Sequence, residues 1–160
     1  MTQVTPAAPQ MRHLFTLRAA LAERIDAGPG ALGRRSFNRV GEGSFAGERL
    51  KGVMTPGSGD WMLTRSDGVN MIDARVMLVT DDGAAIYMRY EGRVAIPATV
   101  LDQARDPARR GELDPSDYFM RSIPVFETGA PEYAWLNDVL AVGAGRLTPE
   151  GVTYEVFEVL

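Results

Sequence analysis

Cysteine is absent from the 160 residues of this chain, and histidine and lysine each occur once. Without cysteine the chain forms no disulfide bond, no thiolate nucleophile and no cysteine-bound zinc or iron–sulfur centre. The single histidine, His13, excludes multi-histidine metal sites, and no Gly-x-Ser-x-Gly nucleophile elbow occurs. We therefore expect no metal site, and we interpret His13 as a surface residue.

Long hydrophobic runs are also missing, and no apolar stretch approaches the length of a membrane span. Residues 1–10 are polar and rich in proline and alanine, without the apolar core of a secretory signal. We interpret them as a disordered N-terminal tail and expect a cytoplasmic protein without membrane attachment. The length suits a single domain over residues 11–160.

An excess of positive charge is also lacking, since acidic residues outnumber basic ones, the net charge is −4 and the sequence pI is about 5.0. The basic residues, nearly all arginine, are scattered along the chain. Nucleic-acid binding depends on cations that neutralise phosphates, so we expect no nucleic-acid partner. Hydrophobic residues make up 45% and charged residues 24%, as in an ordinary globular domain.

Glycine is plentiful, and Gly41, Gly43 and Gly47 lie close together. Their spacing does not match a phosphate-binding loop, because no Gly-Lys-Ser/Thr follows and no strong helix begins there. Glycines at bulges or bends of a curved sheet explain the pattern better. We therefore expect no nucleotide cofactor, and with the metal argument above, no cofactor at all.

Short alternating segments separated by turn residues run through most of the chain. Asp67-Gly68 and Asp82-Gly83 flank the most regular of them, residues 69–80, and predict a three-stranded meander. No strand is followed by a long helix, which disfavours parallel folds. The pattern predicts an all-β protein, and the glycine-rich bends favour a barrel over a sandwich.

Other segments carry more local predictions. Residues 11–25 fit helical and strand periodicity equally, with propensity slightly favouring helix. Residues 26–30 read as a turn, and residues 133–142 as a strand that precedes a bulge at 143–145. Residues 97–117 form a long polar loop, with helical turns near 99–105, that is typical of a rim or lid.

Several short motifs occur in an order typical of one protein family. They are Gly59-Asp60-Trp61, Leu63 to Asp73-Ala74-Arg75, Asp82-Gly83-Ala84 with Ile86-Tyr87, Tyr118-Phe119-Met120-Arg121 with Pro124-x-Phe126-Glu127, Tyr133 to Asn137, and Tyr154 to Phe157. Together they resemble the domain-of-unknown-function family 3237, small bacterial and fungal proteins, over roughly residues 14–160. The chain departs from the family pattern at Met120 and in its alanine-rich first strand.

The resemblance implies an up-and-down antiparallel β-barrel with a central cavity, which agrees with the roughly eight or nine strands read from the pattern. It also implies that residues 13–25 form the first strand, against local helix propensity. A role on small organic molecules follows from the resemblance as an expectation.

Candidate catalytic residues cluster around the glycine-lined turn at 57–61. Asp60 follows the turn and precedes Trp61, whose apolar ring would raise the pKa of the carboxyl group; a turn-capping role for Asp60 is the alternative. Asp73 and Arg75 are two residues apart on one strand and share a face. Inside a barrel they would pair or act on a substrate, whereas outside they would be solvated.

Further candidates come from later strands. Tyr90 shares a face with apolar residues and would present its hydroxyl group there. Arg121 lies among apolar neighbours and needs a partner, either Glu127 or an aspartate on another strand. We also expect six residues to line a substrate site: Trp61, Arg121, Glu127, Tyr133, Trp135 and Asn137. For the two tryptophans an ordinary place in the core is the alternative. For Asn137 the alternative is hydrogen bonding to the loop backbone.

Two functions from different classes follow. The first is a cofactor-independent enzyme, an isomerase, cyclase or lyase, acting by acid–base chemistry on a small aromatic or polyketide-like metabolite. Asp60 or Asp73 would be the base, Arg75 or Arg121 the electrophile, and Tyr90 the acid or orienting group. The second is a non-catalytic, lipocalin-like barrel that binds a small ligand. A homodimer through edge strands or the 97–117 loop also stays open.

Overall fold

The computed structural model describes residues 7–160, so most of the expected N-terminal tail lies outside the described residues. Within residues 7–160 the chain forms ten strands, one short α-helix and three 3-10 helices. Their bounds are β1 Met11–Gly30, β2 Gly33–Ala46, β3 Lys51–Met54, β4 Gly59–Asp60, β5 Leu63–Thr64, β6 Asn70–Thr80, β7 Ala85–Ala95, α1 Leu101–Arg105, η1 Arg110–Glu112, η2 Pro115–Asp117, β8 Phe119–Glu127, η3 Pro131–Asp138, β9 Ala141–Leu147 and β10 Gly151–Val159.

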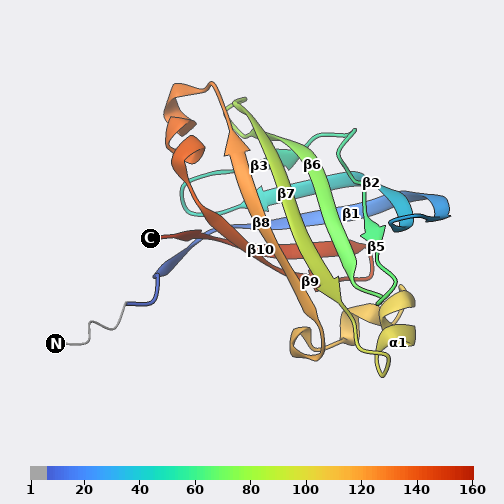
Figure 1. The fold of residues 1–160 in the computed structure, drawn as a ribbon. Helices are drawn as coiled ribbons and strands as arrows, with labels where there is room; N and C mark the ends of the chain where they lie inside the picture. The colour runs from blue at the N-terminus through green and yellow to red at the C-terminus, as the bar shows by residue number, and fades with distance from the viewer. Residues whose placement is uncertain (1–6) are drawn as a thin grey trace.

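The strands form one antiparallel sheet that closes into a ring (Figure 1). Consecutive strands pair from β6 through β10, and β3, β4 and β5 all connect β2 with β6. The first strand completes the ring, because it pairs with β10 along one side and with β2 along the other. The protein is therefore an all-β barrel with up-and-down order.

The predicted barrel is confirmed, and the conflict over residues 11–25 is resolved in favour of a strand. Helix propensity there is outweighed because β1 forms backbone hydrogen-bonded pairs with two neighbours, from Met11 to Gly30. Each strand alternates inward and outward side chains, so the buried residues of β6 and β7 are the even-numbered ones.

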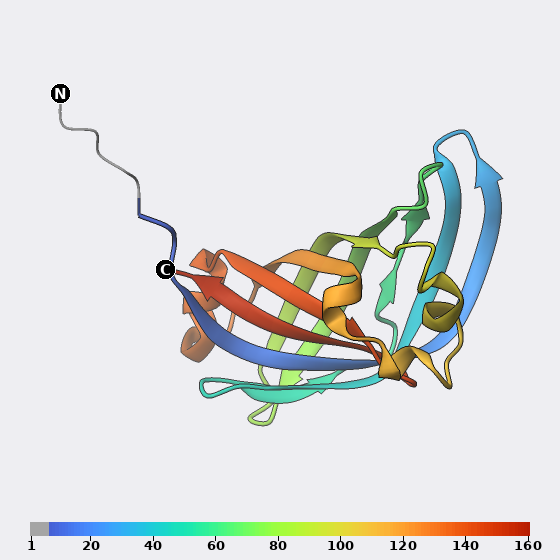
Figure 2. The same ribbon diagram turned by 90° about the horizontal axis from the view of Figure 1, so that it is seen from below.

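The two ends of the barrel differ. At one end, which we call the mouth, lie Asn70, Ala95 and Gly151, the helix α1, and the β1–β2 hairpin (Figures 1 and 2). The hairpin extends beyond the mouth because β10 stops pairing at Ala20, whereas β1 and β2 remain paired to Gly30. The helix η3 lies at the far end.

The interior toward the far end is filled by apolar side chains. Phe15 packs edge-on against Phe45 and Phe126, with ring centroids 5.7 and 5.9 Å apart. Leu17, Leu78 and other fully buried aliphatic residues complete this part of the core. Such packing leaves the open space of the barrel at the mouth rather than along its axis.

Gly143 and Gly145 lie in regular register with β10, so the predicted bulge at 143–145 is wrong. Both glycines face the interior, where they leave room for Tyr154. A Cβ atom on Gly145 would lie 2.6 Å from the ring of Tyr154 and 2.6 Å from the side chain of Met120. These glycines are therefore required by packing across the barrel rather than by a change of register.

Two other local predictions are wrong. The turn predicted at 26–30 is instead a bulge within β1, and the hairpin turns at Ala31 and Leu32. Asp26 accepts a hydrogen bond from the Gly28 amide at 2.8 Å, and Gly28 has a φ of +80°, so the turn-forming residues make the bulge. Residues 133–137 belong to η3, where Pro131 favours the helical start.

The remaining segments follow their predictions more closely. Residues 101–105 are helical, and η1 and η2 lie within the loop expected between 106 and 117. Among the described residues, none of the helices has the length and apolar character needed to cross a membrane.

We predict that Gly145→Ala destabilises the protein. The new methyl group would overlap the Tyr154 ring and the Met120 side chain, and overpacking of this kind costs about 1–3 kcal/mol in free energy of unfolding. Urea denaturation measures the change.

The matched control is Gly129→Ala, because a Cβ atom there meets nothing within 4 Å. We expect this variant to unfold close to the wild-type midpoint. Equal stability of the two alanine variants would contradict the packing role of Gly145.

Candidate functional site

Polar side chains form one row across the inner face of the barrel near the mouth. The strand registers pair Arg24 with Asn38, Asn38 with Asp60, Asp60 with Ala74, and Ala74 with Tyr90. Residues directly opposite one another on paired strands place their side chains on the same face. Ala74 is fully buried, so the row follows the inner face, and Arg24 at its end is exposed on the β1–β2 hairpin.

The small side chain of Ala74 determines the spacing of this row. Neighbouring strands lie about 4.8 Å apart, so Asp60 and Tyr90 are separated by two such steps with a single methyl group between them. A larger residue at position 74 would fill the space over which the carboxylate and the phenol face each other. Burial raises the pKa of Tyr90, and the charge of Asp60 raises it further, as expected for neighbouring groups.

Asp60 is held in a fixed orientation. Its Oδ1 atom accepts a hydrogen bond from the backbone amide of Asp73 at 3.0 Å. Burial raises the pKa of the Asp60 carboxyl group, and the hydrogen bonds from the Asp73 amide and the Asn38 side chain act in the opposite direction. A carboxylate with a raised pKa is a stronger proton acceptor than an ordinary aspartate.

Two tyrosines lie beside this carboxylate. Tyr90 and Tyr154 pack edge to face with ring centroids 5.6 Å apart, and both are buried. Burial raises the pKa of each phenol far above neutral pH, and the negative charge of Asp60 raises both further. The tyrosines are therefore hydrogen-bond donors at neutral pH and not anions.

Two further polar groups belong to the same part of the inner face. The amide of Asn38 contacts the sulfur of Met62 at 3.9 Å. The hydroxyl group of Ser36, on the next inward position of β2, is buried and has no hydrogen-bond partner among the described residues. Buried hydroxyl groups are usually hydrogen-bonded, so Ser36 leaves an unused donor and acceptor in the interior.

A cavity of about 900 Å³ occupies the mouth directly above this row. Met62, two residues beyond Asp60 on the same strand face, lies in its lining and contacts Asn38 below. Asp60 itself is partly buried and lies one step beneath the cavity lining. The volume matches that of sites that bind small organic molecules.

The cavity lining is mixed. Apolar side chains come from the segments beside β5 and β6 and from the segment around α1, including Val69, Ile96 and Leu101, whereas β5 and β6 themselves contribute the polar Thr64 and Asn70. Charged side chains stand at the rim, where Arg34 forms an ion pair with Asp26. Within residues 7–160 two other arginines in the lining form no ion pair, Arg24 from β1 and Arg105 from α1.

Three predicted site residues lie outside the barrel. Asp73 and Arg75 form an ion pair at 3.1 Å with both side chains well exposed, so the expectation that they face the interior is wrong. Trp61 packs against Phe37 on the same outer face, and Arg75 lies over its ring at 5.3 Å. The physical reason is strand parity, because odd residues of β6 point outward.

Arg121 and Glu127 also point outward, on β8. Arg121 donates to the carbonyl oxygen of Met120 at 2.9 Å and lies over the ring of Phe119. Among the described residues neither forms an ion pair, so the expected partnership between them is absent. Both lie away from the mouth cavity.

The remaining three predicted residues belong to η3 at the far end. Tyr133 donates to Asp82 at 3.1 Å, and Trp135 stacks beneath Arg49, which lies 3.9 Å from the ring centre. Asn137 accepts from the amide of Thr128 at 2.9 Å and donates to its carbonyl group at 3.1 Å. Asn137 thus makes loop-backbone contacts, the alternative that the sequence left open.

Of the ten residues expected from the sequence, the structure brings Asp60 and Tyr90 together on the inner face. Sequence reasoning missed Arg24, Asn38, Ser36 and Tyr154. These residues are brought together by the pairing register between strands, which cannot be read from any single segment of the sequence. In the described part of the chain, no group of three or more histidine, cysteine, aspartate or glutamate residues is placed to hold a metal ion.

The arrangement suits proton transfer. Asp60 is oriented so that it can accept a proton, Asn38 and Arg24 can donate hydrogen bonds to a negative charge, and Tyr90 can act as a neutral donor. Arg24 lines the cavity, whereas Asn38, Asp60 and Tyr90 lie outside its lining, so a bound molecule would have to extend beneath Met62 to contact them. It would be partly shielded from water there, which strengthens each electrostatic interaction.

The chain is similar to curated proteins from several bacteria. A UPF0311 protein of Clostridium acetobutylicum is 35% identical over 130 residues, which cover 80% of this chain and 79% of that protein. A UPF0311 protein of Rhodopseudomonas palustris is 30% identical over 152 residues, which cover 94% of this chain and 97% of that protein.

Solved structures with the same fold include a conserved protein of unknown function from Rhodopseudomonas palustris, with a TM-score of 0.88 and 29% identity over 98% of this chain and 100% of that chain. A β-barrel-like protein from Acinetobacter baumannii has a TM-score of 0.83 and is 32% identical, and the match covers 99% of this chain and 100% of that chain. An enzyme from Penicillium herquei has a TM-score of 0.74 and is 18% identical, and the match covers 99% of this chain and 100% of that chain. At this identity the similarity shows a shared fold alone.

A family profile described as "Protein of unknown function (DUF3237)" matches residues 9–159, nearly the whole chain. The match agrees with the motif order noted in the sequence and with the fold shared by the solved structures. The chain belongs to the DUF3237 family.

Proposed function

We propose that the protein catalyses proton transfer on a small, largely apolar carbonyl compound bound in the mouth cavity, as part of an isomerisation, cyclisation or elimination. Asp60 is the general base. The observation that supports this most is the row of Arg24, Asn38, Asp60 and Tyr90 on the inner face, with the Asp60 carboxylate oriented and its pKa raised by burial.

In the proposed step, Asp60 removes a proton from a carbon atom next to the substrate carbonyl group. The electron pair of the broken C–H bond moves into the carbonyl group and forms an enolate. The amide of Asn38 and the guanidinium of Arg24 donate hydrogen bonds to the enolate oxygen. Asp60, now protonated, returns the proton to another atom of the substrate, and Tyr90 holds the substrate as a neutral donor.

The cavity supports a substrate of aromatic or polyketide-like character. Its lining is apolar at Met62 and Val69 and along the segment that leads into α1, which suits a ring system or an acyl chain. The free arginines at the rim suit an oxygen-rich or anionic end of the same molecule. Proton transfer of this kind uses only side chains of the protein, and one protein with this fold, from Penicillium herquei, is described as an enzyme.

Binding without turnover, as in a lipocalin, is the second candidate, and the apolar lining of the cavity favours it. The two candidates differ in whether Asp60 exchanges protons with the bound molecule. A proton-exchange assay therefore separates them before the natural substrate is identified.

We predict that the protein accelerates deuterium uptake from D₂O at the α-carbon of small cyclic and aromatic ketones, and that Asp60→Asn loses this activity by about 100-fold or more, as for the loss of a general base. NMR of the ketone panel measures the exchange rate. Asp73→Asn, which removes a neighbouring carboxylate on the outer face, is the matched control and should keep the wild-type rate.

Full exchange in a folded Asp60→Asn variant would exclude Asp60 as the base. Binding of a panel ketone without any catalysed exchange would favour the lipocalin-like role.

We also predict that Asp60 makes folding less favourable as the pH rises. A carboxyl group whose pKa is raised in the folded state imposes no penalty below its ordinary pKa and imposes the full penalty above the folded-state pKa. The neutral amide of the Asp60→Asn variant would resemble the protonated acid at every pH. The free energy of unfolding of this variant, measured relative to wild type by urea denaturation, should therefore be higher at pH 8 than at pH 4. A difference that does not change with pH would refute the raised pKa.

A further inference from the structure

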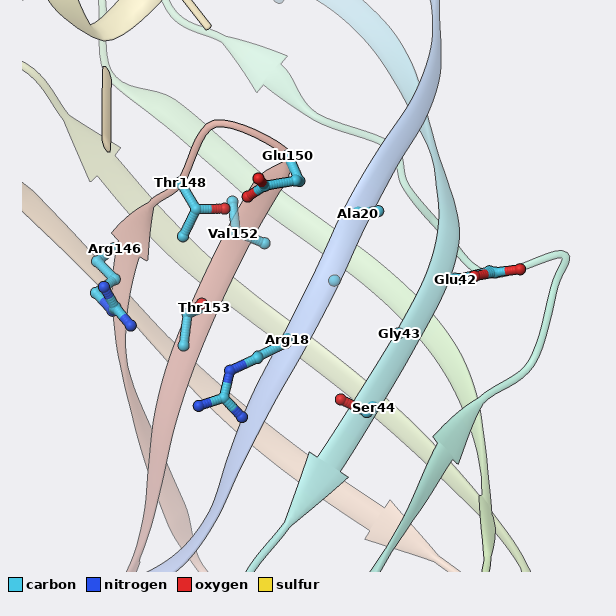
Figure 3. A pocket seen from close by; sticks show the side chains of 11 residues that line it. Arg18, Ala20, Glu42, Gly43, Ser44, Arg146, Thr148, Glu150, Val152 and Thr153 are labelled. Atoms are coloured by element: carbon cyan, nitrogen blue, oxygen red, sulfur yellow. The ribbon is translucent and has the colours of Figure 1, made fainter. Parts of the chain in front are cut away.

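A second hollow, of about 490 Å³, lies on the outer face of the barrel where β9, β10, β1 and β2 run side by side (Figure 3). Arg18 and Arg146 stand on either side of Thr153 in this hollow. It is separate from the mouth cavity, because Arg18 and Thr153 belong to the outward-facing positions of their strands.

Cross-strand register explains how these groups meet. Arg146 is opposite Thr153, Thr153 is opposite Arg18, and Arg18 is opposite Ser44. The four residues therefore form a single row on one face, with two guanidinium groups flanking one hydroxyl group and a second hydroxyl group at the end. Every member of the row is a hydrogen-bond donor.

Thr153 is the most informative member of the row. It is only 3% exposed although it lies on the outer face. Its hydroxyl group lines the hollow and has no hydrogen-bond partner within residues 7–160. Its oxygen atom is not among the fully enclosed polar atoms without a partner, which within residues 7–160 include only Ser36 Oγ, so this hydroxyl group is open to the hollow and can bond to a molecule there.

The two arginines are likewise unpaired. In the described part of the chain neither Arg18 nor Arg146 lies within 4.0 Å of a carboxylate, although the net charge of the chain is −4. Glu155, the carboxylate on the next outward position of β10, accepts instead from Thr16 at 2.6 Å and contacts His13 at 2.8 Å. Figure 3 shows Glu42 directed away from Arg18.

We propose that this row is a binding site for the oxyanion group, a carboxylate or a phosphate, of a small molecule. Arginine presents its donors as a planar fork that matches such groups, and two forks with a hydroxyl group between them can contact three oxygen atoms. The rest of the hollow has small or apolar residues, among them Ala20, Gly43 and Val152, together with Thr148 and the carboxylates of Glu42 and Glu150. The oxyanion is therefore expected at the arginine row and not at the part of the hollow beside these glutamates.

The test is titration of the full chain with inorganic phosphate, acetate and succinate at constant ionic strength, followed by NMR amide shifts and calorimetry. We expect saturable binding, with shifts centred on Thr153 and its neighbours on β1 and β9. The acetate and phosphate arms show which of the two oxyanions the row prefers. Shifts that grow linearly with concentration for every anion would overturn the proposal.

Variants locate the site. Arg18→Gln and Arg146→Gln should each weaken binding about tenfold or more, as for the loss of a charge-assisted hydrogen bond. Arg18→Lys, which retains the charge but lacks the fork, should weaken binding less than Arg18→Gln. Thr153→Val tests the buried hydroxyl group without changing the net charge, and weaker binding is expected there too.

The matched control is Arg93→Gln, because Arg93 is another arginine without an ion pair among the described residues, lies on β7 outside the hollow, and donates to the carbonyl oxygen of Gly92. Binding should be unchanged in this variant. Equal weakening in the Arg18, Arg146 and Arg93 variants would show general charge attraction and refute a built site.

Discussion

The pairing of β1 with both β10 and β2 is the interaction on which the rest of the structure depends. It closes the sheet into a ring and leaves no long edge strand exposed. Closure also divides the side chains of every strand into an inward and an outward set. The helix propensity of the β1 sequence is overcome because both sides of the strand form backbone hydrogen bonds to neighbours.

The inward-pointing side chains differ in chemical character between the two ends of the barrel. The part toward the far end is a conventional packed core, whereas the part near the mouth holds a carboxylate, an amide, a buried serine hydroxyl and two buried phenols. Burying such groups costs stability unless they are fully hydrogen-bonded, and Asp60 has a raised pKa because this compensation is partial. An arrangement that lowers stability at one end of an otherwise well-packed barrel is typical of a functional site.

The outward-pointing side chains also form rows across neighbouring strands, and these rows differ in charge from one part of the barrel to another. On β6 and β7 the outward-pointing side chains form ordinary surface ion pairs, Asp73 with Arg75 and Arg89 with Glu91. On β9, β10 and β1 the corresponding row contains only donors, and its central threonine is buried between the two flanking arginine positions. The same alternation that builds the inner site thus also places Arg18 and Arg146 side by side.

The sequence by itself determined the all-β class, the meander around β6, the location of Asp60 after a glycine-lined turn and the face that Tyr90 shares with its apolar neighbours. It also determined that Asp73 and Arg75 share a face, because strand alternation is a local property. Only the tertiary structure decided which face is inside, since that depends on the ring closing around one side of every strand. The same holds for the partnership of Arg24, Asn38 and Asp60, because register between strands far apart in the chain is set by pairing and not by any one segment.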